Sequence, residues 1–416
     1  MSKLLLEVMV QANNLPKLRF PEFFGNYESK KIEDITTRIT KPVELKDDIE
    51  YTEIGIRSWG KGIFHKEKTS KEQIGNKRVF WLEPDLFIVN IVFAWEQALA
   101  KTTEQELGKI ASHRFPMYKP KKEQVTLDYL VWLFLTNKGK YLLEMASPGG
   151  AGRNKTLGQK EFNRLRVNLP SLSEQSRVAH SINLIDKRIS LLKEKYALLT
   201  QYKKGVMQKL FKQEIRFKDD NGSDFPDWQE QRFEQVFERV TRKNKEDNQN
   251  VLTISAQQGL INQEKYFNKS VSANDVTGYY LLEKGDFAYN KSYSKGYPMG
   301  AIKRLNNYDK GVVSTLYICF KSHGEQQDEF WEQYFEAGNL NREINKIAQE
   351  GARNHGLLNV SVTEFFHDVK VIAPCAEEQQ KIADFLQALD KKLDAVNQQI
   401  ELTQTFKKGL LQQMFV

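Results

Sequence analysis

The chain has 416 residues, more than one domain of about 100–200 residues requires, so we expect two or three domains. Hydrophobic residues make up 40% and charged residues 28%, and the mean hydropathy of -0.59 excludes an integral membrane protein. The formal net charge of +8, with an isoelectric point of about 9.0, favours a polyanionic partner such as a nucleic acid.

Cysteine usage and the first residues indicate the compartment. The two cysteines, Cys319 and Cys375, are too few for a disulfide framework and lack Cys-x-x-Cys spacing. The apolar stretch 4–10 is interrupted by Glu7, and no small-residue cleavage site follows, so it does not match a secretory signal. We therefore expect a cytoplasmic protein whose residues 1–14 form a loose N-terminal tail.

The first predicted domain spans residues 15–170. It opens with Phe-Pro-Glu-Phe at 20–23, followed by Tyr27, and it contains the apolar β-type run 87–93. Its loops mix glycine with basic, amide and aromatic side chains, which can contact base edges and phosphates while glycine lets the backbone approach DNA. The candidate DNA-binding residues of this domain are Arg57, Trp59, Lys61, Arg153, Asn154 and Lys155.

Residues 171–217 form a predicted helical spacer. Pro170 precedes them, and Ser173 with Glu174 suits a helix start. Apolar residues then recur at steps of three and four, which places them on one stripe of a single helix of about 39 residues, roughly 58 Å long at about 1.5 Å per residue. The stripe comprises Val178, Ile182, Ile185, Ile189, Leu192, Tyr196 and Leu199.

The second predicted domain spans residues 218–373. It opens with Phe-Pro-Asp-Trp at 225–228, and it contains the β-type run 312–318. An ordinary polar turn is the alternative interpretation of each candidate loop, and a packing role is the alternative for Trp59 and Tyr293. The candidate DNA-binding residues of this domain are Gln257, Gln258, Asn290, Lys291, Tyr293, Lys295, Arg353 and Asn354.

Residues 374–416 form the C-terminal helical spacer and repeat the central one. The segment 170–211 can be laid on 374–415 without a gap, at a constant offset of 204 positions. Two unrelated amphipathic helices are the alternative, but ungapped agreement over some forty positions argues against it. The obvious partner of each helix is the other, packed antiparallel, with the two domains related by a pseudo-twofold axis. The predicted helix-pairing residues are Ile182, Ile185, Ile189, Leu192, Leu386, Leu389, Leu393 and Val396.

The repeat extends weakly into the domains. Gly-Arg-Asn at 152–154 faces Gly-Ala-Arg-Asn at 351–354, and Phe162 maps onto Phe366 at the same offset of 204. Between these landmarks the two halves diverge almost completely. A constant helical frame that carries two divergent domains indicates that the domains recognise different things.

No signature of catalysis is present. The sequence lacks a Gly-x-x-x-x-Gly-Lys-Ser/Thr phosphate loop, a His-Glu-x-x-His zinc motif, an Asn/Asp-Pro-Pro-Tyr methyltransferase signature and a Gly-x-Gly-x-x-Gly turn. A Mg²⁺-dependent nuclease would continue from such an element into Glu-x-Lys: Pro226-Asp227 has no such continuation nearby, and Glu28-Ser29-Lys30 after Pro21-Glu22 is a pattern common by chance. We therefore expect no catalytic site and no metal site in the chain.

Taken together, these motifs resemble those of the specificity subunit of type I DNA restriction–modification enzymes. They are the doubled Phe-Pro-Glu/Asp-Phe/Trp element, the Gly/Ala-x-Arg element, the Glu-Gln helix starts and the Lys-Lys-Gly helix ends. The resemblance covers residues 15 to 416, and Tyr27, in place of a tryptophan, is its one local departure.

The resemblance implies an α+β architecture of two mixed α/β target-recognition domains, each reading half of a bipartite DNA sequence, separated by two antiparallel helices that form a coiled-coil spacer. It implies no activity in this chain alone and no cofactor of its own. The expected partners are double-stranded DNA, two methyltransferase subunits that bind S-adenosylmethionine, and two restriction subunits that use ATP and Mg²⁺.

Two other functions stay open from the residues alone. One is a coiled-coil adaptor whose two globular domains bind proteins, and the other is an enzyme with an unrecognised site. Salt-dependent binding to duplex DNA distinguishes the DNA-binding subunit from the adaptor. Methyltransferase activity of the isolated chain would favour the enzyme.

Overall fold

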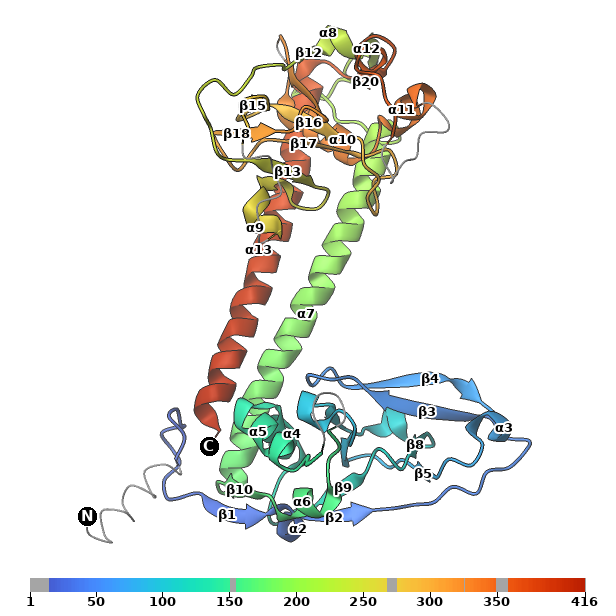
Figure 1. Ribbon diagram of the computed structural model, residues 1–416, viewed down its shortest axis with the longest axis vertical. Coiled ribbons are helices and arrows are strands. Elements are labelled where there is room, and N and C mark those ends of the chain that lie inside the picture. The colour runs from blue at the N-terminus through green and yellow to red at the C-terminus, as the bar shows by residue number, and fades with distance from the viewer. Residues whose placement is uncertain (1–14, 150–154, 268–274, 325, 349–357, 416) are drawn as a thin grey trace. The chain divides into compact units, whose positions relative to one another are not determined.

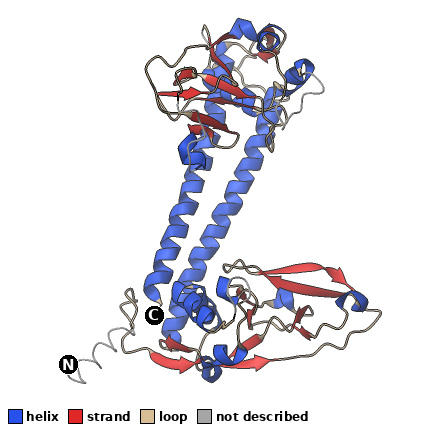
Figure 2. Cartoon of the chain, viewed as in Figure 1, coloured by secondary structure: helices blue, strands red, loops and turns tan. Residues whose placement is uncertain are grey.

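The computed structural model describes residues 15–149, 155–267, 275–324, 326–348 and 358–415 (Figure 1). The chain divides into two compact units: unit 1 comprises residues 1–193 and 398–416, and unit 2 comprises residues 194–397. Both units mix helices and strands, as the colours of Figure 2 show. Each unit also takes a part of both long helices, so the units do not end where the predicted domains do.

Unit 1 contains two four-stranded sheets, ordered β2-β9-β6-β7 and β4-β3-β8-β5, and a short antiparallel ladder of β1 with β10. The ladder joins the first strand to the strand that leads directly into the long helix α7, with Glu28 opposite Leu169. The elements of this unit are β1 (Glu28–Lys31), α2 (Ile32–Ile35), β2 (Thr36–Ile39), β3 (Tyr51–Ile56), β4 (Ile63–Thr69), α3 (Lys71–Ile74), β5 (Val79–Trp81), β6 (Phe87–Val89), η1 (Ala94–Glu96), β7 (Leu99–Lys101), η2 (Glu104–Glu106), β8 (Ile110–Ser112), β9 (Met117–Pro120), α4 (Leu127–Leu135), α5 (Asn137–Met145), α6 (Gln159–Arg164) and β10 (Arg166–Leu169).

Unit 2 repeats the frame of unit 1. The ladder of β11 with β20 and the sheet β12-β19-β16-β17 have the order of their unit 1 counterparts, although the sequences diverge. The elements are β11 (Gln229–Arg232), α8 (Phe233–Val236), β12 (Phe237–Arg239), β13 (Leu252–Ser255), β14 (Gly259–Asn262), α9 (Gln263–Phe267), β15 (Tyr280–Glu283), β16 (Phe287–Asn290), β17 (Ala301–Arg304), β18 (Lys310–Val313), β19 (Ile318–Ser322), α10 (Asp328–Glu336), α11 (Asn341–Ile347), α12 (Val362–His367) and β20 (Lys370–Ala373).

The two long helices have the predicted length. α7 (Leu172–Phe211) has 40 residues and α13 (Ala376–Met414) has 39. In unit 1 the start of α7 and the last residues of the chain share one hydrophobic core, which includes Ile182 and Phe415. In unit 2 the end of α7 and the start of α13 share another, which includes Leu210 and Leu386. The helices therefore run antiparallel in each unit, and the predicted α+β fold class is confirmed.

Ion pairs between the helices obey the same offset of 204. Lys203 of α7 pairs with Asp390 of α13 in unit 2, at 2.6 Å, and Lys407 of α13 pairs with Asp186 of α7 in unit 1. Lys203 corresponds to Lys407, and Asp186 corresponds to Asp390, so the two ion pairs are equivalent. Equivalent contacts of this kind are expected when a repeated unit packs with pseudo-twofold symmetry.

A buried glutamine fixes each domain to its helix. The side-chain carbonyl of Gln175, near the start of α7, accepts a hydrogen bond from the backbone N–H of Thr126 at 2.9 Å. The equivalent Gln379 of α13 accepts one from the N–H of Gln327 at 3.3 Å. Thr126 and Gln327 are the N-caps of α4 and α10, so each bond positions the first turn of a helix that covers the four-stranded sheet.

The two predicted β-type runs are shorter strands than expected. Within 87–93 only β6 (Phe87–Val89) is a strand, because the Asn90 side chain accepts a hydrogen bond from the N–H of Val92 and turns the chain. The run 312–318 is divided between β18 and β19, with a turn between them. No helix among the described residues is long and apolar enough to span a membrane.

Candidate nucleic-acid interface

The loop between β3 and β4 carries three predicted DNA-binding residues of unit 1. The short helix η1 holds the backbone of this loop, because the N–H of Trp59 donates to the Glu96 carbonyl at 2.8 Å. Trp59 has a positive φ of 63° and is 54% exposed, so neither backbone preference nor core packing explains a tryptophan there. The Arg57 guanidinium lies over the Phe64 ring at 4.6 Å, and both Arg57 and Lys61 are exposed.

Lys155 joins this loop through the short helix η1. Its ammonium lies 5.9 Å from the centre of the Trp95 ring, next to the Glu96 carbonyl that holds Trp59. Lys140 of α5 lies over the Trp59 ring at 5.2 Å. Trp59 and Lys155 thus both contact η1, and Arg57 and Lys61 flank Trp59 in the same loop, a mixture of cations and aromatic rings suited to a nucleic acid.

A cleft of about 410 Å³ lies beside η1 in unit 1 and has a cationic rim. The buried Glu53 carboxylate pairs with Lys66 at 2.9 Å and lies 3.9 Å from Lys77. Arg114 is exposed on the turn before β9, and its backbone carbonyl accepts the N–H of Ile91 at 2.9 Å. The cleft is lined by Glu53, Lys66, Lys77, Asn90, Val92, Phe93, Ser112, His113, Arg114 and Phe115.

In unit 2 the loop after β16 carries four predicted residues. The Asn290 side chain accepts the N–H of Ser292 at 3.0 Å, so this carbonyl is engaged in forming the turn. Lys291 is half-buried, and burial lowers the pKa of its ammonium. Tyr293 is 64% exposed and Lys295 is exposed at the tip of the loop. Tyr293 and Lys295 are therefore the exposed side chains among the predicted residues of this loop.

The remaining predicted residues are distributed elsewhere. Gln257 and Gln258 are exposed in the turn between β13 and β14. Arg153, Asn154, Arg353 and Asn354 lie outside the described residues. Of the predicted helix-pairing residues, Ile182, Ile189, Leu386, Leu389 and Val396 are buried, and Ile185, Leu192 and Leu393 are half-buried. Tyr196, placed on the same stripe, is 38% exposed.

Sequence reasoning missed several candidates. Lys140, Trp95, Phe93 and Arg114 join the unit 1 surface only through folding, and no motif marks them. Unit 2 holds a further basic cleft of about 550 Å³ at the edge strand β12. The sequence does indicate this basic cleft, because residues 239–245 contain four cations in seven positions. Its charged lining comprises Glu238, Arg239, Arg242, Lys243, Lys245 and Lys321.

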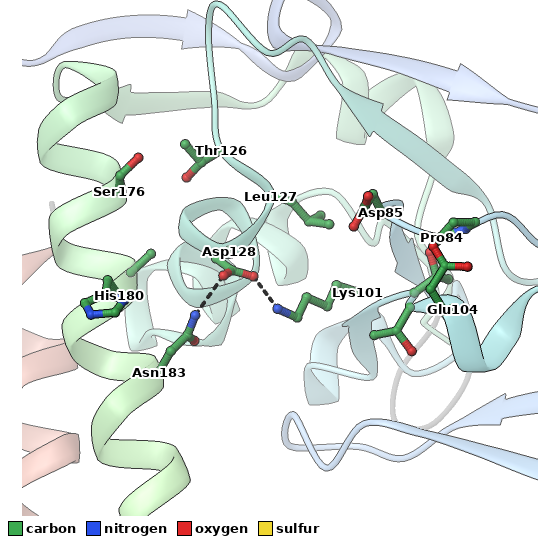
Figure 3. Close-up of a pocket in the computed structure, with 13 residues that line it drawn as sticks. Pro84, Asp85, Lys101, Glu104, Thr126, Leu127, Asp128, Ser176, His180 and Asn183 are labelled. Atoms are coloured by element: carbon green, nitrogen blue, oxygen red, sulfur yellow. Dashed lines mark hydrogen bonds and ion pairs between the residues drawn. The ribbon is translucent and has the colours of Figure 1, made fainter.

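The cavity drawn in Figure 3, about 500 Å³ in volume, belongs to the frame of unit 1 and not to this interface. There the Asp128 carboxylate accepts hydrogen bonds from Lys101 at 2.6 Å and from Asn183 of α7 at 2.7 Å. Arg304 and Glu329 form the corresponding pair in unit 2, at 2.8 Å. Among the described residues, no group of three or more His, Cys, Asp or Glu side chains is placed to hold a metal ion.

The first half of the chain is similar to a known family of domains. Residues 25–201 match the type I restriction modification DNA specificity domain. A Methanocaldococcus jannaschii protein that carries the name type I restriction enzyme MjaX specificity subunit is 22% identical over 222 residues. That alignment covers 48% of this chain and spans about half the length of the relative, 48%.

Solved structures share the fold. The HsdS subunit of Thermoanaerobacter tengcongensis aligns with a TM-score of 0.52 and 14% identity, covering 94% of this chain and 96% of the other. The type I restriction-modification S subunit of M. genitalium aligns with a TM-score of 0.55 and 12% identity, covering 97% and 99%. A chain from a study of complex assembly and conformational transition of the type I R-M system aligns at 0.53 and 12% identity, covering 92% and 96%.

These matches confirm the resemblance that the repeated motifs indicated. Residues 25–201 match the DNA specificity domain of type I restriction–modification systems, and nearly the whole chain has the fold of the solved specificity subunits.

Proposed function

We propose that the chain is the DNA-reading subunit of a type I restriction–modification complex. It binds a bipartite target, one half-site to each unit, and catalyses no reaction itself. The main support is that the same arrangement of sheet, ladder and long helix occurs in both units, while the loops on it differ in sequence. A repeated frame can hold two DNA-binding domains in equivalent positions, and loops of different sequence can recognise different bases.

The loops support DNA as the ligand. Unit 1 presents Arg57, Lys61 and Lys155 around η1, and unit 2 presents Lys291 and Lys295 after β16. Cations on exposed loops attract phosphates, and the neighbouring exposed aromatic rings offer contacts to bases. The net charge of +8 has the matching sign.

An exposed apolar pair on each long helix supports a scaffolding role. Leu198 and Tyr202 of α7 are 59% and 53% exposed, and Leu402 and Phe406 of α13 are 62% and 59% exposed. Each pair lies four residues apart on one helix face, and the two pairs are 204 positions apart. Two equal apolar surfaces fit two copies of one partner, which we take to be the methyltransferase subunits.

The chemistry then belongs to the partners. The methyltransferase subunits would bring S-adenosylmethionine, and two restriction subunits would bring ATP and Mg²⁺. The chain contributes binding and orientation: it holds the target in register so that a partner attached to the helices meets the DNA beside each half-site.

Duplex binding across a salt series tests this function. For the purified chain, log K against log salt should fall with a slope of about -0.9 for each phosphate neutralised. A duplex with the methylated motif of the host should bind more tightly than a scrambled duplex at every salt concentration. A protein-binding adaptor, the second candidate, would retain the apolar pairs on the helices but show neither behaviour.

A further inference from the structure

We propose that Phe93 in unit 1 and Tyr293 in unit 2 are equivalent aromatic contacts to the bases of the two half-sites, and that Arg114 and Lys291 beside them determine which bases are read. This assignment rests on the proposed function, since it names the side chains through which each unit reads DNA.

The two aromatic residues occupy the same position in the repeated frame. β6 and β16 are the corresponding inner strands of their sheets, and each is followed by an asparagine-stabilised turn. Asn90 accepts from the N–H two residues ahead at 3.1 Å, and Asn290 does so at 3.0 Å. Phe93 and Tyr293 are therefore both the third residue after the asparagine that forms the turn.

A second backbone contact fixes both loops in the same way. The carbonyl of Ile91 accepts the N–H of Leu157 at 2.8 Å, and the carbonyl of Lys291 accepts the N–H of Leu358 at 3.0 Å. Each loop is thus held by its own asparagine and by the segment that leads to the last short helix of the domain. Residues 90–92 and 290–292 are therefore held at matching points, and Phe93 and Tyr293 each follow directly after them.

Both aromatic side chains are exposed, Phe93 by 39% and Tyr293 by 64%. A single exposed apolar residue needs no explanation, but recurrence at one position of two divergent loops does. An aromatic ring on a DNA-binding loop can contact a thymine methyl group or partly enter a base step. Phe93 and Arg114 both line the 410 Å³ cleft, so a ring and a cation border the same space.

The neighbours of the two rings differ, and this difference can encode two half-sites. In the sheets, Met117 faces Ile88 and Cys319 faces Ala288, so the residues three positions earlier, Arg114 and Leu316, correspond. Arg114 is exposed and, among the described residues, has no carboxylate partner, whereas Leu316 is 66% exposed. Unit 1 thus offers a guanidinium that can pair with guanine, and unit 2 offers the Lys291 ammonium and an apolar side chain.

Alanine variants of the full-length chain test the aromatic contacts. Affinity is measured by fluorescence anisotropy for a duplex carrying the motif that the wild-type complex methylates. Phe93→Ala and Tyr293→Ala should each weaken binding by about 10-fold, the effect of about 1.4 kcal/mol expected for one base contact. Matched controls are Phe24→Ala, at a residue 87% exposed in unit 1, and Tyr266→Ala, at one 46% exposed in unit 2. Variants that bind as tightly as these controls would overturn the assignment.

Substitution of the neighbours tests the reading. Arg114→Gln should relax discrimination at positions of one half-site only, and Lys291→Gln at positions of the other, when duplexes with single base changes are compared. Changes in the same half-site, or a uniform loss across all sequences, would refute the assignment. DNA binding by the wild-type chain that does not depend on salt would instead refute the proposed function. Failure of the residue assignment and failure of the proposed function can therefore be told apart.

Discussion

Glu174 and Glu378 are equivalent buried carboxylates, 204 positions apart, and each secures the segment that leads into its own domain. Glu174 accepts hydrogen bonds from Arg19 at 2.8 and 2.7 Å and from the Tyr27 hydroxyl at 3.0 Å. Glu378 accepts them from Arg216 and from the indole N–H of Trp228, the latter at 3.2 Å. Tyr27 therefore takes the place of the expected tryptophan, because Tyr27 and Trp228 donate to the equivalent carboxylates Glu174 and Glu378.

Removal of either glutamate should destabilise its unit strongly. Glu378→Ala removes the carboxylate partner of a partly buried guanidinium and the acceptor of an indole N–H, at a cost of about 3 kcal/mol. Trp228→Phe removes one donor and should cost about 1 kcal/mol. Urea unfolding followed by intrinsic fluorescence, with circular dichroism for the tryptophan variant, measures both. Equal midpoints for Glu378→Ala and wild type would contradict the role given to this carboxylate.

The ion pairs between the helices should show weak coupling of similar size in both units. Lys203 is 13% exposed and Asp390 is 39% exposed, so solvent screens the pair in part. A double-mutant cycle with Lys203→Ala and Asp390→Ala should give about 0.5–1 kcal/mol. The cycle for Lys407 and Asp186 should give no more, since that aspartate is 51% exposed. Strictly additive single changes in both cycles would show that the pairs contribute nothing.

Cys319 should resist thiol reagents that modify Cys375. Burial raises the pKa of the Cys319 thiol to about 12, whereas Cys375 is half-buried. Because the thiolate is the reactive form, alkylation at pH 8 should label Cys375 first, as peptide mass spectrometry can show. The pKa of Cys319 is higher in the folded than in the unfolded protein. Its contribution to the free energy of unfolding is therefore fully present below about pH 9 and is lost as the pH rises towards about 12. Rapid labelling of Cys319 in the native protein would contradict its burial.

The sequence predicted the frame well because the frame is repeated. Glu-Gln pairs, long apolar stripes and a fixed offset can be read directly from the sequence, and they predicted α7, α13 and their antiparallel packing. The strands were harder to predict, since one apolar run contains both β6 and the turn formed by Asn90. The sequence marked Arg57, Trp59, Lys61 and Lys155 of the unit 1 surface but not Lys140 and Arg114, because these two come from segments with no motif and reach this surface only through tertiary packing.

The exposed apolar pairs should be needed for assembly and not for DNA binding. A Leu198→Arg, Tyr202→Glu variant should lose one of two bound methyltransferase subunits, because charge on the helix face opposes burial against an apolar partner. The matched Leu402→Arg, Phe406→Glu variant should lose the other. Sedimentation measures the stoichiometry, and duplex binding by the isolated chain serves as the control. Full assembly by the variant with all four changes would place the partners elsewhere.

Each unit should read its own half of a bipartite target. Replacing residues 15–170 with the corresponding domain of another specificity subunit, followed by methylation-aware sequencing of DNA modified by the assembled complex, tests this claim directly. We predict a motif in which one half is new, while the other half matches that of the wild-type complex. A motif with both halves changed, or with neither changed, would contradict domain-wise reading.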